Sequence, residues 1–186
     1  MKKALVLPLA VLLAACGDSP DLASPSLATG GITAHAHGEG VFDAGVPVAF
    51  QFGIVQRDAS SEAASGELRF TTDLGGLAVA FGGQATCLAV DAANARAWIA
   101  GVITENNSTH PSFTGPLNQV GKDIWFRVVD YGEGAGAPQV DRTTFVGFEG
   151  SAGIGTSAEY CATRPWPDGD ARTGPVLEGN IQVVAR

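Results

Sequence analysis

Apolar and polar residues alternate along residues 46–56, and this pattern constrains the fold more than any other feature of the chain. The apolar side chains take every second position: Val48, Phe50, Phe52 and Ile54. Successive side chains of a β-strand point to opposite faces of the sheet, so the alternation predicts a strand with one buried and one exposed face. The same reasoning predicts half-buried strands over residues 32–41 and 67–72.

Further strand patterns follow, separated by turns. They cover residues 77–81, 84–90, 96–104 and 180–184. Gly82 and Gly83 separate the first two of these runs and predict a bulge or bend there.

The best-specified element is a β-hairpin. An aromatic and β-branched run at residues 124–130, a glycine-rich acidic loop at 131–138 and a second alternating run at 141–148 follow one another. This order is typical of two antiparallel strands joined by a long loop, and we expect it to define the fold.

Together these patterns predict an all-β fold, an antiparallel β-sandwich or partly open barrel of about eight or nine strands with two long loops. The 25 glycines and 10 prolines suit a turn-rich protein. The two loops are residues 104–122 and 149–175, and long loops on a β scaffold often carry function. Residues 58–65 are the only stretch that permits a helix, and we expect a polar loop there.

The N-terminus has the layout of an export signal. Lys2 and Lys3 precede an apolar run at residues 4–14 that is too short for a membrane span. The run ends in Leu13-Ala14-Ala15-Cys16, which resembles the lipobox of bacterial lipoproteins. The resemblance implies that residues 1–15 are a signal peptide and that Cys16 is lipidated. The alternative is an ordinary secretory signal with Cys16 as a bystander thiol.

The domain organisation and location follow from that resemblance. Residues 16–30 are expected to be the lipidated cysteine and a flexible tether, and residues 31–186 a single domain. The protein would be lipid-anchored in the cell envelope. Gly17 rather than Asp18 follows the cysteine, so the outer membrane is favoured if the host has one.

The charge of the chain limits its partners. The formal net charge is -8, and cleavage after residue 15 would remove Lys2 and Lys3 and give -10. Nucleic-acid affinity is built from Lys and Arg, so we expect no nucleic-acid partner.

Several motifs between residues 30 and 184 occur in a recognisable order. They are Phe50-Gln-Phe-Gly53 with Gln56-Arg57, Gly66-Glu-Leu-Arg-Phe70, Ala85-Thr-Cys-Leu-Ala-Val90 leading into Ala97-Trp-Ile-Ala-Gly101, Val128-Val-Asp-Tyr-Gly-Glu-Gly134 with Asp141, and Leu177-Glu-Gly-Asn-Ile-Gln-Val183. Their order resembles the post-COAP type of uncharacterised exported bacterial β-domain. The chain departs from that type at Tyr131, at Gly134 and in the insertion at 149–175. The resemblance implies an exported β-domain and no particular activity.

Cys87 and Cys161 remain once Cys16 is lipidated, and export places them in an oxidising compartment. We expect a disulfide that fixes the loop 149–175 to the strand 84–90. The alternative is two separate buried thiols. No other Cys or His lies at the close spacing of a zinc site.

His35, His37 and Glu39 form the clearest metal-like pattern, because alternate residues of a strand share one face. His110 is a candidate fourth ligand. The competing interpretation, which we favour, is a solvated strand face.

Asp130, Glu133 and Asp141 flank the hairpin loop and are candidate calcium ligands, since Ca²⁺ takes six to eight oxygens. We favour the interpretation that the aspartates cap turn amides. Asp168 and Asp170 admit the same two interpretations.

Signals for catalysis are weak. Ser112 and Ser151 lie in expected loops without a nucleophile-elbow motif. Trp125, Trp166 and Tyr131 are candidates for a carbohydrate-stacking platform, although Trp98 and Trp125 within strands are better explained as core residues. We predict a non-catalytic structural or interaction module with a protein or carbohydrate ligand and no cofactor. The alternative is a metal-binding protein or metal-dependent enzyme that uses His35, His37 and Glu39, or a calcium site.

Overall fold

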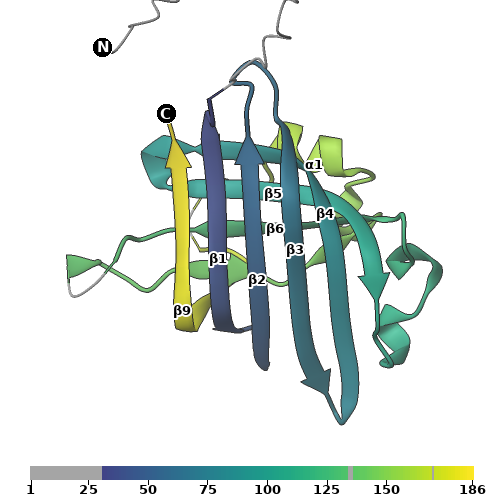
Figure 1. Cartoon of the computed structure of the whole chain (residues 1–186). Coiled ribbons are helices and arrows are strands. Elements are labelled where there is room, and N and C mark those ends of the chain that lie inside the picture. Colours follow the sequence, from purple (N-terminus) through teal and green to yellow (C-terminus); the bar gives the residue numbers. More distant parts are fainter. Residues whose placement is uncertain (1–30, 134–135, 169) are drawn as a thin grey trace, which may run out of the picture.

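The structure is a computed structural model that describes residues 31–133, 136–168 and 170–186. Within these ranges the chain forms nine strands, one α-helix and short 3-10 turns (Figure 1). The predictions for the signal peptide, Cys16 and the tether concern residues 1–30 and lie outside the described residues. The strands are β1 (Ala34–Asp43), β2 (Pro47–Gln56), β3 (Ala63–Leu74), β4 (Leu77–Asp91), β5 (Arg96–Asn106), β6 (Asp123–Val129), β7 (Arg142–Thr144), β8 (Gly147–Phe148) and β9 (Thr173–Ala185).

The strands form one antiparallel sheet that closes into a barrel. Its order is β5-β4-β3-β2-β1-β9-β7-β6, and β6 pairs back with β5. Eight strands thus complete the barrel, and β8 is an additional strand beside β6. In Figure 1, β1 to β4 and β9 run along the front while β5 and β6 cross behind them. The prediction of an all-β antiparallel fold with eight or nine strands is confirmed.

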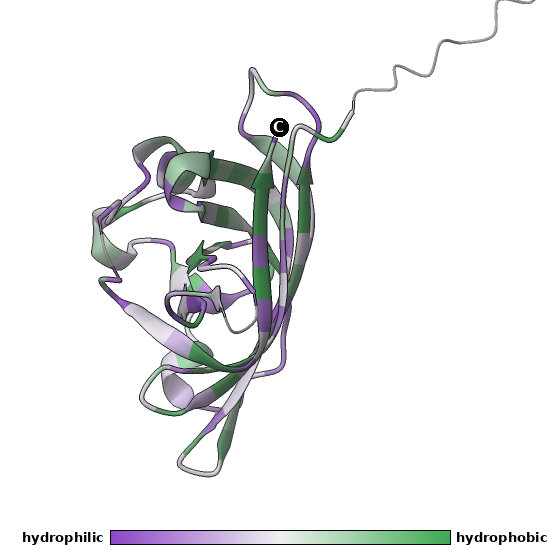
Figure 2. Ribbon diagram, turned by 90° about the vertical axis from the view of Figure 1, so that its left-hand side faces the viewer, coloured by the Kyte–Doolittle hydropathy of each residue, from purple (hydrophilic) through white to green (hydrophobic). Residues whose placement is uncertain are grey.

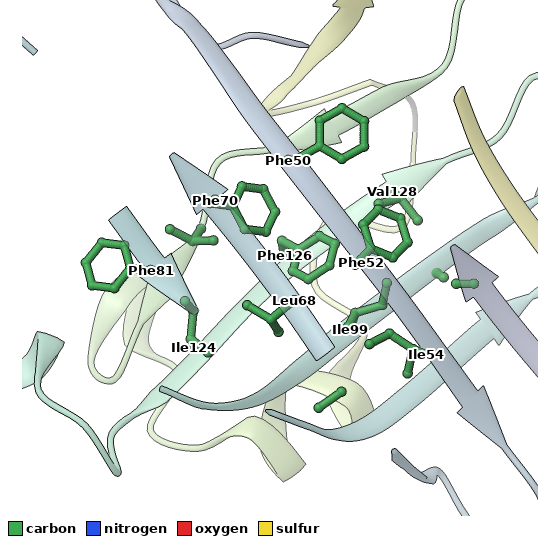
Figure 3. Packing of buried hydrophobic residues seen from close by; sticks show 14 of the residues in the cluster. Phe50, Phe52, Ile54, Leu68, Phe70, Phe81, Ile99, Ile124, Phe126 and Val128 are labelled. Carbon is green, nitrogen blue, oxygen red and sulfur yellow. The ribbon is translucent and has the colours of Figure 1, made fainter. Parts of the chain in front are cut away.

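Phenylalanine side chains fill the interior of the barrel. Hydrophobic and hydrophilic residues alternate along the long strands (Figure 2), and on β2 the alternate residues are buried as predicted. Phe126 of β6 meets Phe52 and Phe70 with ring centroids 5.1 and 4.9 Å apart (Figure 3). Aromatic pairs of this kind contribute about 0.5–1.5 kcal/mol each beyond their buried area. Side chains of the described residues therefore pack the barrel interior.

Two glycines allow the long strands to bend into the barrel. Gly40 and Gly66 both have φ of +148°, a conformation that side chains disfavour. A Cβ at Gly40 would lie 1.9 Å from the carbonyl oxygen of Glu178, and one at Gly66 would lie 2.0 Å from that of Gly53. Close approach of neighbouring backbones at these bends therefore requires glycine. The bend predicted at Gly82 and Gly83 is also present, as a register shift between β4 and β5.

The predicted hairpin is present, although its returning strand is divided. β6 pairs with β7 through Val128 and Val129, and with β8 through Ile124 and Trp125. Phe145 and Val146 separate the two short strands. β7 also pairs with β9 over three residues, and this short contact closes the barrel.

The loop at residues 149–175 contains a helix that the sequence analysis missed. α1 (Ser157–Thr163) begins after Thr156, whose hydroxyl accepts a hydrogen bond from the Glu159 amide. It ends at Arg164, which has the left-handed conformation typical of a helix C-terminus. Residues 58–62 form a turn, as expected, but β3 already begins at Ala63 rather than at residue 67.

The loop at residues 104–122 is shorter than predicted. β5 continues to Asn106, and the rest contains the 3-10 turns η2 (Pro111–Phe113) and η3 (Pro116–Asn118). Among the described residues, no helix is long and apolar enough to cross a membrane. β1 begins and β9 ends at the same end of the barrel, where the Arg186 amide donates to the Thr33 carbonyl oxygen.

Candidate functional site

The outer face of the barrel carries a groove across β2, β3, β4 and β5. Its volume is about 530 Å³. Gly53, Gly82 and Gly83 line it without side chains, and polar side chains stand around them. The principal polar lining residues are Gln51, Glu67, Arg69, Gln84 and Glu105. Hydrophobic side chains, many of them aromatic, fill the interior of the barrel where a ligand would otherwise bind. The groove on the outer face is therefore the leading candidate site.

Strand register places the polar residues in two parallel rows on this face. In the first row, Glu39, Gln51, Arg69, Gly82 and Glu105 lie opposite one another on successive strands from β1 to β5. We call this the Glu39 row. The groove thus collects residues that are far apart in the sequence.

The second row lies two residues further along the strands. His37, Gly53, Glu67 and Gln84 are opposite one another from β1 to β4, and we call them the His37 row. Since side chains alternate along a strand, both rows point away from the interior. The groove forms where glycines interrupt these rows.

The ion pair between Arg69 and Glu105 spans the groove. Arg69 Nη1 lies 3.3 Å from Glu105 Oε2, and both side chains are largely exposed. The two residues come from β3 and β5, and Gly82 of β4 lies between them. Gln84 donates a hydrogen bond of 2.8 Å to the carbonyl oxygen of Gly66. Backbone and ion-pair contacts therefore hold three of the lining side chains, Arg69, Gln84 and Glu105, in place.

A smaller hollow extends the groove towards β9. Its volume is about 240 Å³, and it shares Gln51 and Phe52 with the main groove. His37, Glu39 and Asn180 complete its lining together with Gly38. The polar face therefore continues from β5 to β9.

The hairpin loop meets this face at β9. Glu133 Oε1 accepts a hydrogen bond of 3.0 Å from Asn180 Nδ2 and another from Gln182 Nε2. Asn180 and Gln182 lie opposite Glu39 and His37. Glu133 is thus attached to the end of the two rows.

The predicted histidine ligands lie on this outer face. The rings of His35 and His37 stack with centroids 5.8 Å apart. His110 is in another element, at the start of η2, where its Nδ1 accepts from the Ser112 amide. Residues 31–133, 136–168 and 170–186 contain no group of three or more His, Cys, Asp or Glu side chains arranged to hold a metal ion. The candidate set of His35, His37 and Glu39, which is the less favoured interpretation, is thus not among such groups in the described residues.

Two of the three candidate calcium ligands, Asp130 and Asp141, accept hydrogen bonds from backbone amides. Asp130 accepts hydrogen bonds from Gly132 and Val183. Asp141 accepts 2.9 and 2.8 Å hydrogen bonds from the amides of Tyr131 and Ile181. These contacts match the turn-cap interpretation and also connect the hairpin to β9.

Burial removes water from around the Asp141 carboxyl group. Burial raises the pKa of this carboxyl group, while the two amide hydrogen bonds act in the opposite direction. The neighbouring carboxylates Asp130 and Glu133 raise the pKa further. Asp141 is therefore a structural carboxylate whose stability contribution depends on pH.

The predicted disulfide joins Cys87 and Cys161, whose Cα atoms are 6.4 Å apart. As expected, it fixes the 149–175 segment to β4. Ser157 donates to the Gly101 carbonyl oxygen over 2.6 Å, and its amide donates to Asp123 over 2.7 Å. The disulfide and these bonds hold α1 against the outer side of the barrel, where it contacts β4, β5 and β6.

Trp98 and Trp125 lie beneath this covering segment. Trp98 and Trp125 are only 1% and 2% exposed, in a second cluster outside the barrel core. Trp125 stacks on Tyr160 of α1, with ring centroids 5.5 Å apart. The expectation that both tryptophans are core residues is confirmed, and they are unavailable as a carbohydrate platform. Trp166 instead stacks with Arg172, whose guanidinium carbon is 4.4 Å from the ring centroid.

Arg127 is a structural residue that the sequence analysis did not identify. It is fully buried on the outer side of β6 and donates to the carbonyl oxygens of Trp166 and Ala171. Burial lowers the pKa of its guanidinium. A charged residue within the apolar run 124–130 was the available signal, because a buried charge requires partners.

Asp170 contributes to the same region. It accepts a 2.5 Å hydrogen bond from the Tyr131 hydroxyl and lies 3.5 Å from Arg142 Nε. The hydroxyl of Ser151 accepts from the Phe148 amide. These predicted candidates thus stabilise loops.

Comparisons with protein-family models, characterised proteins and solved structures give no match. The groove and its polar lining are therefore the features of this chain that point to a function.

Proposed function

We propose that this chain is a lipid-anchored bacterial envelope protein whose barrel is a non-catalytic binding module. The observation that carries the proposal is the groove across β2 to β5, with its floor of glycines and its polar rim. Amide and carboxylate side chains at fixed strand positions provide donors and acceptors for a polar ligand. The site would bind its ligand on the outside of the barrel.

The proposed location of the protein in the cell envelope supports this function. The segment ending at Cys16 resembles a lipobox, and the Cys87–Cys161 disulfide suits an oxidising compartment. Three acyl groups on Cys16 would bury many methylenes at about 0.8 kcal/mol each, enough for stable anchoring. An anchor that joins the barrel at the start of β1, which lies at one end of the barrel, would leave the groove on the outer face accessible.

The chemistry of the lining residues favours binding over catalysis. The described residues that line the groove include no serine, cysteine or histidine, and these are common nucleophiles and general bases of hydrolases. Within the described part of the chain, the groove also lacks a free pair of carboxylates of the kind that glycosidases use, because Glu105 is paired with Arg69 and only Glu67 is unpaired. A polar recognition surface is the function that this set of side chains supports best.

Site-specific photo-crosslinking in cells tests this function. A photoreactive residue placed at position 51 lies in the groove, whereas one at position 49 lies on the same strand outside it. We expect discrete adducts from position 51 that are absent from position 49. Equal adducts from both positions, or none from position 51, would contradict a binding role for the groove.

A further inference from the structure

The groove face carries more negative than positive charge. Glu39, Glu67 and Glu105 line the groove or its extension, and Arg69 is the only Lys or Arg among these lining residues. The lining therefore has three carboxylates against one guanidinium, a net charge of -2 with His37 neutral. Glu39 and Glu67 form no ion pair within the described chain.

This local charge agrees in sign with that of the whole molecule. The full chain has a formal net charge of -8. A groove with an excess of one sign of charge attracts a ligand of the opposite sign. Charge complementarity therefore indicates a cationic ligand.

The remaining chemistry favours a polypeptide over a carbohydrate. Sugar-binding sites usually present aromatic faces, but the one aromatic residue among the described residues that line the groove, Phe52, is 4% exposed and packs in the barrel core. Trp98 and Trp125 are buried under α1. Gln51 and Gln84 instead offer amide groups, which pair with peptide N–H and C=O groups.

The positions of the carboxylates suit an extended chain. Glu39, Glu67 and Glu105 belong to β1, β3 and β5, so neighbours in this series are two strands apart. Strands lie about 4.8 Å apart, which separates these positions by roughly 10 Å across the sheet. An extended polypeptide in the polyproline II conformation has three residues per turn and rises about 3.1 Å per residue, so side chains three residues apart share a face and lie about 9 Å apart.

We infer that the groove binds an extended segment of another protein that carries Lys or Arg about every third residue. This inference rests on the proposed binding function and specifies its partner. The basic side chains pair with Glu39 and Glu67, and the segment passes over Gly53. Arg69 remains paired with Glu105 and marks one side of the path.

The test uses two kinds of variant of the full chain, purified in a non-ionic detergent. Glu39→Gln with Glu67→Gln removes groove charge, and Asp168→Asn with Glu178→Gln removes the same charge at exposed residues outside the groove. Gly53→Leu places an apolar side chain in the groove and leaves the charge unchanged. The fold should tolerate it, because a Cβ at Gly53 has no heavy atom within 4 Å. Ala49→Leu is its matched control, exposed on the same strand but outside the groove.

The probe is a fluorescently labelled peptide of glycine and serine with lysine at every third position and with both ends blocked so that they carry no charge. Protein is titrated into it and binding is followed by fluorescence anisotropy. We expect the groove double variant and Gly53→Leu to weaken binding about tenfold, as the loss of exposed charge pairs and of the bound path implies. The two controls should change the dissociation constant less than about twofold. Binding should also weaken as salt is raised.

Any of three results would overturn the inference. Equal weakening by both double variants would mean a general attraction to an acidic protein. Unchanged binding in Gly53→Leu would mean that the peptide lies elsewhere. If the position-51 adducts persist in cells but contain glycan, or a protein that lacks spaced basic residues, the groove is a binding site and the cationic partner is wrong. Loss of those adducts altogether would instead contradict the proposed function itself.

Discussion

Arg69 and Glu105 stand two strands apart and form an ion pair across Gly82, a residue with no side chain. A Cβ at Gly82 would lie 3.4 Å from both Cβ and Oε2 of Glu105, at the limit of ordinary van der Waals contact, so the pair crosses close above this residue. The relationship shows how the groove is made. Glycines open space between rows of polar side chains, and long side chains from neighbouring strands border it.

Replacing Arg69 by Gln should separate stability from binding. Both members of the pair are largely exposed, so the free energy of unfolding should fall by less than about 1 kcal/mol. The groove would gain net negative charge, and the lysine peptide should bind more tightly. Urea unfolding and peptide titration measure the two effects, and weaker peptide binding would contradict the cationic-ligand inference.

Removing the disulfide should loosen α1. Cys87 and Cys161 are 74 residues apart, and the double change Cys87→Ala with Cys161→Ala should lower the free energy of unfolding by about 2–5 kcal/mol. Tryptophan emission should shift to the red, because Trp98 and Trp125 lie under α1. An unchanged urea midpoint and emission spectrum would show that other contacts suffice to hold the helix.

Replacing Arg127 by Met should destabilise the segment around residues 164–172. The change keeps an unbranched side chain but leaves the carbonyl oxygens of Trp166 and Ala171 without their buried donor. Leaving these part-buried acceptors without their donor costs about 1–3 kcal/mol. Limited proteolysis and urea unfolding should both reveal it. The exposed Arg57→Met is the control and should behave like the unchanged protein.

Asp141→Asn should show a pH-dependent cost. Its two oxygens accept from two amides, and an Asn side chain would turn an NH2 group towards one of them, at about 1–3 kcal/mol. The pKa of Asp141 is raised in the folded state, so its contribution to stability is full below the ordinary value of 3.8. It is lost as the pH rises through the raised pKa. The cost of the substitution should therefore shrink from pH 3 towards pH 7, and a cost that grows over that range would contradict this assignment.

Cys16→Ala tests the anchor. The variant should move from the membrane fraction to the soluble fraction after signal removal, because the acyl chains would be missing. Cell fractionation and mass spectrometry of the N-terminal peptide measure this. Retention in the membrane fraction would show that lipidation at Cys16 is not the anchor.

Much of the fold could be predicted from local pattern. The alternation on β2 and the sequence of the hairpin specify strands directly, because burial on one face follows the two-residue period. The pairing of Cys87 with Cys161 followed from their number and compartment. The choice of barrel over sandwich could not be predicted, because it depends on the three-residue contact between β7 and β9.

The helix and the groove were missed for physical reasons. α1 has only seven residues and is stabilised by the disulfide and by Trp125, which are tertiary contacts. Gln51, Glu67 and Gln84 each look like ordinary outward residues of a strand. Only the register of β2, β3 and β4 places them side by side, and register is not visible in any one strand.

The most direct test of the account is the yield of adducts from a photoreactive residue at position 51, compared between Gly53→Leu and Ala49→Leu backgrounds in cells. If the groove is the binding site, Gly53→Leu removes most of the adduct while Ala49→Leu leaves it intact, because only the first change fills the groove. Equal yields in the two backgrounds would contradict the central claim.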